Sequence, residues 1–406
     1  MAPYESDESI TASETEVPRG RRRAARYVVP LAVTGVAVAT IGLVPALADS
    51  GSPDLPEISA EQLVQNIAES DTEQLSGTVR INTDLGLPDL GGLESGLFSG
   101  AASGGDGGEG SAADPSTRLT ELVSGSHTLR VAADGPDRQK VSLLQEAAEY
   151  SVIHNGKDVW GYDSRSNEVH HSTSGGTGEA EDVPATPKDF AEEALKAVDE
   201  TTSVTVDGTA RVAGRDAYKL LIKPRQSGST VGAISIAVDA RTWTPLKFTL
   251  TPAAGGAAVV DAGFTQVDFG KPAASTFDFT PPKGAEVTEQ DAAEQGEGGF
   301  EPGEGDLPFT PGEDLGQGAE GMDTIGEGWN AIAVLDTGGE GIPSGEEVGG
   351  DFGGFLDSLG DKASGKFGSG TVFKTRLINA LVTDDGKVYV GAVTKDALVK
   401  AADSHR

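Results

Sequence analysis

The sequence predicts an α+β fold: an antiparallel sheet curled into an incomplete β-barrel, followed by a small C-terminal α+β module. Between residues 53 and 283 the patterns run in the order helix, several strands, helix, several strands. Two helices are too few to cover both faces of a large sheet. We therefore expect the sheet to curl around its own apolar face. An acidic tract then separates this body from a shorter run of strand and helix patterns.

The first helix is expected over Ala60–Ser70. Ser59 with Gln62 three residues later forms a capping box, which starts a helix. Apolar residues recur behind it at helical spacing, namely Leu63, Val64, Ile67 and Ala68. Strict alternation of apolar and polar residues over 78–85 then predicts that a strand follows this helix directly.

An antiparallel meander is expected next, because short apolar runs alternate with turn residues. The expected strands cover 119–131, 138–144, 150–154, 158–162 and 168–172. Gly135-Pro136-Asp137 marks one turn, and Asn155-Gly156 is typical of a hairpin with a two-residue loop.

A second helix should begin at Thr186 and Pro187, with Pro187 at the first helical position and Asp189 in the first turn. Its apolar face is expected to consist of Phe190, Ala194, Leu195 and Val198. The sheet then resumes with strands over 203–206, 218–223, 233–238, 246–250 and 264–269.

Two tracts rich in Gly and acidic residues contain no Lys or Arg. Residues 85–116 are expected to be a flexible insertion, and residues 284–326 an extended acidic linker. The module over 327–402 should hold a strand at 329–335, a hairpin around Asp384-Asp385-Gly386 and a last helix capped by Thr394. Apolar groups in the flexible segments suggest a mobile plug over the sheet; they are Leu87, Leu90, Leu93, Leu97 and the helical stripe Phe352, Phe355, Leu356 and Leu359.

The N-terminal segment predicts export. Residues 1–26 form an expected disordered cytoplasmic tail that ends in an arginine cluster, and residues 27–48 contain no charge. This run fits a signal peptide cleaved near Ala48 and is also long enough for a signal-anchor helix. Both fates place the body outside the cytoplasm, either tethered or released.

Composition excludes several functions. The chain of 406 residues carries a formal net charge of −33, so nucleic-acid binding is not expected. It contains no cysteine, which excludes disulfides, thiolate metal sites and a lipid-modified cysteine anchor.

No catalytic constellation is found. His170 and His171 are adjacent in a strand and should point to opposite faces, so they cannot easily chelate one metal and are expected to be solvated. The sequence predicts no metal site and no cofactor, and the protein is not expected to be an enzyme.

Several segments of the body resemble the LolA-like family of periplasmic lipoprotein carriers, which includes RseB-type regulators. They are SAEQLVQNIAES with LSGTVRINTDL, NGKDVWGYDSRSNEV, GRDAYKLLIKP, ISIAVDARTWTPLKFTL and FDFTPPKGAEV. The resemblance covers residues 53–287, interrupted by 85–116, and suggests a two-part member of actinobacterial type. It implies lid helices across an incomplete barrel and an apolar cavity for acyl chains, with no cofactor and no catalysis.

The expected ligand is a lipid or the acyl chains of a lipoprotein, bound in the cell envelope by a carrier or chaperone. The alternative is an RseB-like envelope-stress sensor that regulates an anti-sigma factor. A membrane transporter or an anti-sigma factor is therefore an expected partner. The candidate cavity residues are Val79, Ile81, Leu129, Val131, Val141, Leu143, Trp160, Tyr162, Tyr218, Leu220, Ile222, Ile234, Ile236, Leu246 and Phe248. Roughly half should line the cavity, because strand residues alternate between faces.

Overall fold

The computed structural model describes residues 52–86, 113, 122, 124–173, 186–196, 198–290, 322–336 and 360–405. Residues Pro53–Arg406 form one compact unit. The expected tail, the apolar segment 27–48 and the leucine and phenylalanine stripes lie outside the described residues. No helix within the described ranges is long and apolar enough to cross a membrane.

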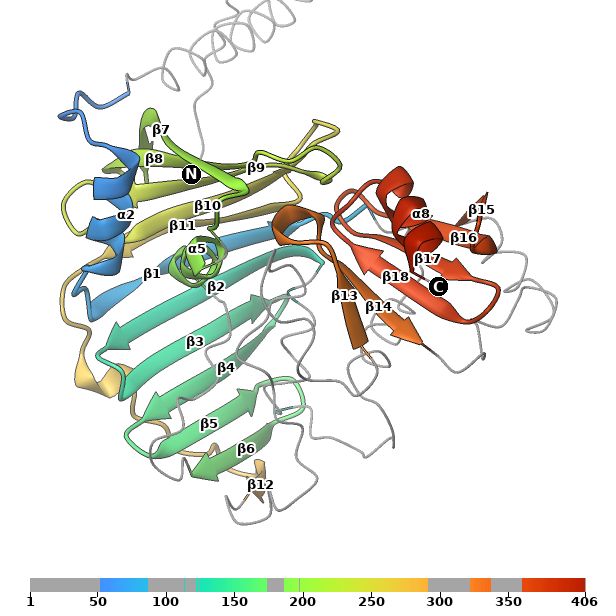
Figure 1. Cartoon of the computed structure of the whole chain (residues 1–406). Helices are drawn as coiled ribbons and strands as arrows, with labels where there is room; N and C mark the ends of the chain where they lie inside the picture. Colours follow the sequence, from blue (N-terminus) through green and yellow to red (C-terminus); the bar gives the residue numbers. More distant parts are fainter. Residues whose placement is uncertain are drawn as a thin grey trace, which may run out of the picture. The chain divides into compact units, whose positions relative to one another are not determined.

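The described part of the body forms a sheet of twelve strands (Figure 1). Their order in space is β12-β6-β5-β4-β3-β2-β1-β11-β10-β9-β8-β7. Their bounds are β1 Gln74–Thr83, β2 Gly125–Asp134, β3 Arg138–Gln145, β4 Ala148–Asn155, β5 Asp158–Asp163, β6 Glu168–Thr173, β7 Thr202–Val212, β8 Arg215–Pro224, β9 Val231–Asp239, β10 Pro245–Pro252, β11 Val260–Asp268 and β12 Glu286–Gln290. β1 joins two meanders, and the end strands β12 and β7 are not paired with each other. The fold class expected from the sequence, an unclosed barrel-like sheet, is confirmed.

Both expected helices are present. Helix α2 spans Ala60–Ala68, and its capping box is confirmed: the Gln62 backbone N–H donates to Ser59 Oγ at 3.1 Å, and the Ser59 N–H donates to Gln62 Oε1 at 3.2 Å. Helix α5 spans Pro187–Lys196 and starts where the proline predicted. Val198 was expected on its apolar face but lies beyond the last turn and is 37% exposed.

The β4–β5 hairpin is confirmed, with its loop one residue later than expected. Asn155 pairs with Asp158, so Gly156 and Lys157 form the loop, and Gly156 adopts a φ of +68° that suits glycine. Strand β12 pairs with β6 in parallel, so the sheet is not wholly antiparallel. Because β12 is short and polar (EVTEQ), its sequence carries no strand periodicity, and it falls within the expected linker.

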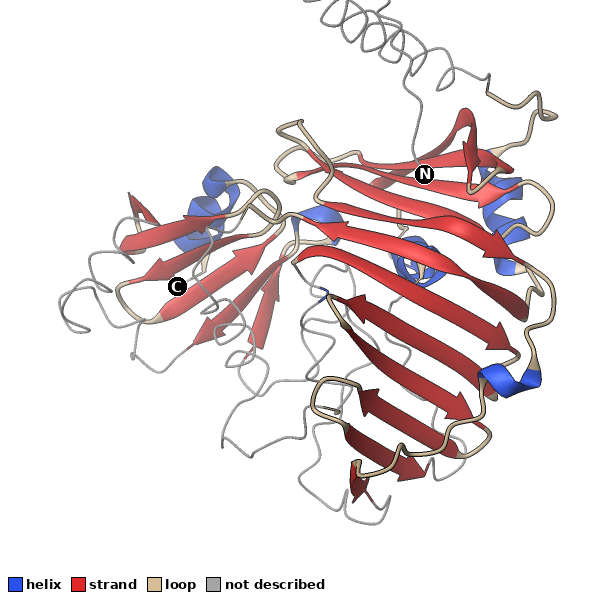
Figure 2. Cartoon of the chain, turned by 180° about the vertical axis from the view of Figure 1, so that it is seen from behind, coloured by secondary structure: helices blue, strands red, loops and turns tan. Residues whose placement is uncertain are grey.

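The C-terminal residues form a second sheet of six described strands with one helix (Figure 2). The elements are β13 Met322–Ile325, β14 Ile332–Asp336, β15 Gly360–Gly365, β16 Gly368–Lys374, β17 Asn379–Thr383, β18 Lys387–Gly391 and α8 Lys395–Ser404. The hairpin expected around Asp384 joins β17 to β18, and Thr394 is the N-cap of α8. Trp329 was expected in a strand, but it lies in the short 3-10 helix η3 (Gly328–Asn330), because β14 starts only at Ile332.

Candidate functional site

One face of the twelve-stranded sheet carries both helices and is called here the helix-bearing face. Residues paired directly across antiparallel strands lie on the same face. Val79 pairs with Leu129, which pairs with Leu143, so an apolar row crosses β1, β2 and β3. On the other half of the sheet, Phe248 pairs with Ile236 in the same way. The register therefore joins both meanders into one apolar surface.

Most of the candidate residues lie on this face. The register places there Val79, Ile81, Leu129, Val131, Val141, Leu143, Tyr218, Leu220, Ile222, Ile234, Ile236 and Phe248. Leu246 is buried in the same cluster as Val79. Trp160 and Tyr162 lie on the opposite face, because the residue between them, Gly161, pairs with Val152 on the helix-bearing face.

The side chains of these residues on the helix-bearing face are covered by other parts of the chain. Apart from the half-buried Val141, the candidates on it are at most 6% exposed. They form two apolar clusters, one around Phe248 and Tyr218 and one around Val79 and Leu143. Phe190 of α5 packs against both clusters and stacks on Phe248, with 5.4 Å between ring centroids. Helix α5 therefore covers the junction of the two clusters.

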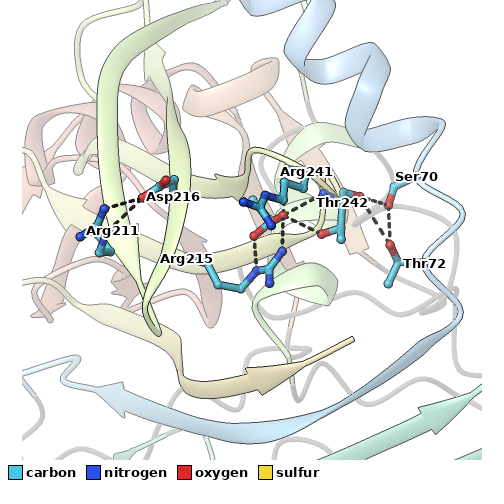
Figure 3. A network of polar contacts seen from close by, with 8 residues as sticks. Ser70, Thr72, Arg211, Arg215, Asp216, Arg241 and Thr242 are labelled. Carbon is cyan, nitrogen blue, oxygen red and sulfur yellow. Dashed lines mark hydrogen bonds and ion pairs between the residues drawn. The ribbon is translucent and has the colours of Figure 1, made fainter. Parts of the chain in front are cut away.

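Helix α2 is fixed at its C-terminal end by polar contacts. Ser70 Oγ donates to the Thr242 carbonyl at 2.8 Å, just after the helix (Figure 3). The Thr242 loop is itself held by Asp239, which accepts from the backbone N–H of Thr242 at 2.8 Å and of Arg241 at 2.9 Å. The helix is thus hydrogen-bonded to the β9–β10 turn.

Asp239 is the centre of this network. Its side chain is 1% exposed and forms a two-point ion pair with Arg215, in which Arg215 Nη2 lies 3.0 Å from Asp239 Oδ1. Burial opposes ionisation, but the hydrogen bonds from Arg215, Thr242 and Arg241 outweigh it and lower the pKa of Asp239. Asp239 therefore stays ionised although it is buried. It links strand β8, through Arg215, to the end of β9 and to the β9–β10 turn.

Helix α5 is held differently. Thr186 and Asp189 cap its first turn reciprocally: the Thr186 N–H donates to Asp189 Oδ2 at 2.8 Å, and the Asp189 N–H donates to Thr186 Oγ1 at 3.3 Å. Its apolar face packs on the sheet's apolar cluster through Phe190, Ala191, Ala194 and Leu195. An apolar ligand could replace contacts of this kind at little cost.

A residue of the 85–116 insertion also lies on the helix-bearing face. Ala113 is fully buried, and its carbonyl accepts a hydrogen bond from the Tyr150 hydroxyl at 3.1 Å. A Cβ on Gly161 would lie 2.3 Å from that carbonyl oxygen, so the close approach requires glycine. The insertion thus contributes to the cover of this face at β4 and β5.

The opposite face carries a cavity of ≈ 320 Å³ over β3, β4 and β5. Its lining residues are Lys140, Glu149, Ser151, Ile153, Tyr162, Ser164 and Phe279. Phe279 lies 5.5 Å from Trp160 and 5.6 Å from Tyr162 between ring centroids. Sequence reasoning missed Phe279 as a contact, although the segment FDFTPPKGAEV drew attention to it.

The histidine pair points to opposite faces, as predicted, but it is not solvated. His170 is 8% exposed, and the His171 side chain is 15% exposed. His171 stacks on Trp160 with 3.7 Å between ring centroids and contacts Asp158 and Glu289. For His171, the prediction of solvation was wrong because Trp160 stacks on the ring and Glu289 of β12 contacts it. Among the described residues, no group of three or more His, Asp or Glu side chains is arranged so that it could hold a metal ion.

No family model and no curated protein matches the sequence. Among solved structures, a chain of the MucA/MucB complex of Pseudomonas aeruginosa is 15% identical, with 84% of this chain and 96% of that chain covered and a TM-score of 0.38. A LolA superfamily protein of Nitrosomonas europaea is 10% identical, with 55% and 99% covered and a TM-score of 0.21. A putative outer membrane lipoprotein-sorting protein domain of Vibrio parahaemolyticus is 12% identical, with 52% and 92% covered and a TM-score of 0.20. At these values no function is carried over from the solved structures.

Proposed function

We propose that the chain binds the acyl chains of a lipid or lipoprotein on its helix-bearing face, without catalysis or a cofactor, as a carrier or chaperone in the cell envelope. The observation that carries this proposal is the continuous apolar surface from β8 to β4. Helices as short as α2 and α5 contribute its cover within the described residues. Burying one methylene group stabilises a complex by about 0.8 kcal/mol, so an acyl chain that replaced part of this cover would be stabilised by each methylene group it buries.

Binding requires that part of the cover moves. Both helices bury apolar groups against the sheet, and α2 is in addition tied to the β9–β10 turn through Ser70. An acyl chain can replace Phe190 at the junction of the two clusters, because one apolar contact is exchanged for another. We therefore expect α5 to be the mobile lid.

Substitution of Phe190 tests this role. In Phe190→Ala, we expect a fluorescent fatty acid to enter faster, because the ring that stacks on Phe248 is removed. Stopped-flow fluorescence on the purified chain, with mass spectrometry of co-purified lipid, makes the measurement. Phe279→Ala is the matched control, since it removes a partly buried phenylalanine from the opposite face. Equal rates in the two variants would exclude α5 as the lid, and no binding by the wild-type chain would refute the function.

Export remains part of the proposal. The charge-free run at 27–48 behind an arginine cluster supports an extracytoplasmic location. Cleavage near Ala48 would give a freely diffusing carrier, whereas retention would tether the lipid-binding body to the membrane. Sequencing the mature N-terminus separates the two forms.

The second candidate function is that of an RseB-like regulator of an anti-sigma factor, in a two-part protein of actinobacterial type. A specific observation favours it: Trp329 belongs to the second sheet's part of the chain but is buried in the apolar cluster with Ile222 and Phe248. A ligand that displaced residues of this cluster would therefore change the packing of Trp329 and, through it, the C-terminal module. Pull-down from membranes with and without added lipid would distinguish an anti-sigma factor from a membrane transporter as the partner.

A further inference from the structure

Strand β12 is an edge strand with few apolar contacts of its own. It pairs in parallel with β6, and Val287 on it is 40% exposed. Glu289 pairs in register with His171. This strand is the last described element before β13 of the second sheet. Its attachment to β6 therefore decides whether residues 286–290 belong to the first sheet.

His171 lies between two carboxylates that come from different strands. Its Nδ1 is 2.5 Å from Glu289 Oε2 on β12, and its Nε2 is 3.1 Å from Asp158 Oδ1 on β5. A carboxylate only accepts hydrogen bonds, and a neutral imidazole has only one N–H to donate. Both contacts can be hydrogen bonds at the same time only when the ring is protonated on both nitrogens.

The surroundings of the ring favour this protonated form. Trp160 stacks on it at 3.7 Å, and an aromatic face attracts a cation. Among the described residues, the charged groups that contact the ring are Asp158 and Glu289, both acidic. The chain's net charge of −33 adds to the same preference. His170 points to the other face of the sheet, since it pairs with Gly161.

We propose that His171 is a pH-dependent latch, which holds β12 on the edge of the sheet when protonated and releases it when neutral. Release of the strand would expose the edge of β6. This inference concerns the opposite face of the sheet and does not depend on lipid binding.

The direction of the pH dependence follows from the pKa. Burial of the ring opposes its protonation, but the hydrogen bonds to Glu289 and Asp158 outweigh burial and raise the pKa of His171. A raised pKa means that the latch contributes its full stability below the ordinary histidine pKa of about 6.5. That contribution is lost as the pH rises through the higher pKa of the folded state.

Hydrogen exchange of the peptide that contains β12, corrected for the intrinsic effect of pH, tests the latch between pH 5.5 and 8.5. We expect protection to fall with rising pH by about tenfold for each unit by which the pKa is raised. The fall should begin at about pH 6.5 and be complete above the pH at which His171 titrates by NMR, so that its midpoint lies between these two values. In His171→Gln, protection should be low and independent of pH. Glu289→Gln should shift the midpoint to lower pH, which keeps the test valid if the first variant folds poorly.

His154→Gln is the matched control. His154 lies on β4, which β5 separates from β6, and its ring contacts the Gly156 carbonyl at 2.9 Å instead of a carboxylate. It should leave the pH course of β12 unchanged. Constant protection in the wild-type chain, or the same pH course in His171→Gln, would overturn the proposal.

Discussion

At the scale of single residues, two aspartate–arginine pairs show how burial decides the value of a charge; Figure 3 labels Arg211, Asp216 and Arg215. Asp239 is 1% exposed and holds Arg215 together with two backbone N–H groups of its own turn. Asp216 pairs with Arg211 at 2.9 Å, but both side chains are exposed, at 43% and 52%. The first pair organises the β9–β10 turn, whereas the second is solvated.

Replacing these two aspartates by alanine should therefore give different results. Asp239→Ala should lower the free energy of unfolding by about 3 kcal/mol, because it leaves Arg215 and the turn N–H groups without their acceptor. Asp216→Ala, the control, should change it by no more than about 0.5 kcal/mol. Urea denaturation at pH 7 measures both. Similar losses in both variants would show that the Asp239 network is not structural.

The stability from Asp239 also has a defined pH dependence. Its pKa in the folded chain is lowered, so the ion pair contributes fully above the ordinary aspartate pKa of about 3.9. The contribution is lost as the pH falls through the lower pKa of the folded state. The difference in the free energy of unfolding between the wild-type chain and Asp239→Ala, measured by urea denaturation, should therefore become smaller at acidic pH.

At the scale of elements, the helix-bearing face is covered by parts that are attached in different ways. Helix α2 is hydrogen-bonded to the β9–β10 turn through Ser70, and α5 buries Phe190 at the junction of two apolar clusters. Ala113 of the insertion fits against Gly161, where no larger residue could stand. A mobile plug was expected from leucines outside the described residues, and Ala113 gives the insertion a contact with this face.

The contact of Ala113 with Gly161 can be tested with a thiol reagent, because the chain contains no cysteine that would react in the background. Ala113→Cys should react slowly with a thiol reagent, since Ala113 is fully buried. Adding Gly161→Ala should raise that rate by roughly tenfold or more, because the new Cβ would lie 2.3 Å from the residue 113 carbonyl. Adding Gly263→Ala is the control, since its Cβ would meet only the flexible Lys247 side chain. Equal rates in both double variants would contradict this contact.

At the scale of the whole molecule, the two sheets share one apolar cluster. Trp329 is 3% exposed, packs with residues of the first sheet, and donates from Nε1 to Thr202 Oγ1 at 2.8 Å. Leu377, which follows β16, is buried in the same cluster. Part of the first sheet's core is thus completed by residues far along the chain.

Trp329→Ala should therefore weaken the first sheet as well as the second. We expect a loss of about 3 to 5 kcal/mol, as for other buried tryptophans, and about 1 kcal/mol for Trp329→Phe, which keeps most of the packing but loses the hydrogen bond. Hydrogen exchange in β8 reports on the first sheet. Phe373→Ala in β16 is the control, because Phe373 is only half-buried and lies in the second sheet. Unchanged exchange in β8 for Trp329→Ala would show that the two sheets are stabilised independently.

The sequence by itself determined the fold class, the capping box at Ser59, the start of α5 at Pro187, the β4–β5 hairpin and the opposite directions of His170 and His171. Each depends on residues within a few positions of one another, which local periodicity and turn chemistry describe. Tertiary structure alone decided which face Trp160 belongs to, that β12 pairs with β6, and that His171 lies between Glu289 and Asp158. These depend on strand register and on contacts between residues far apart in the chain, and a shift of one residue moves every side chain of a strand to the other face.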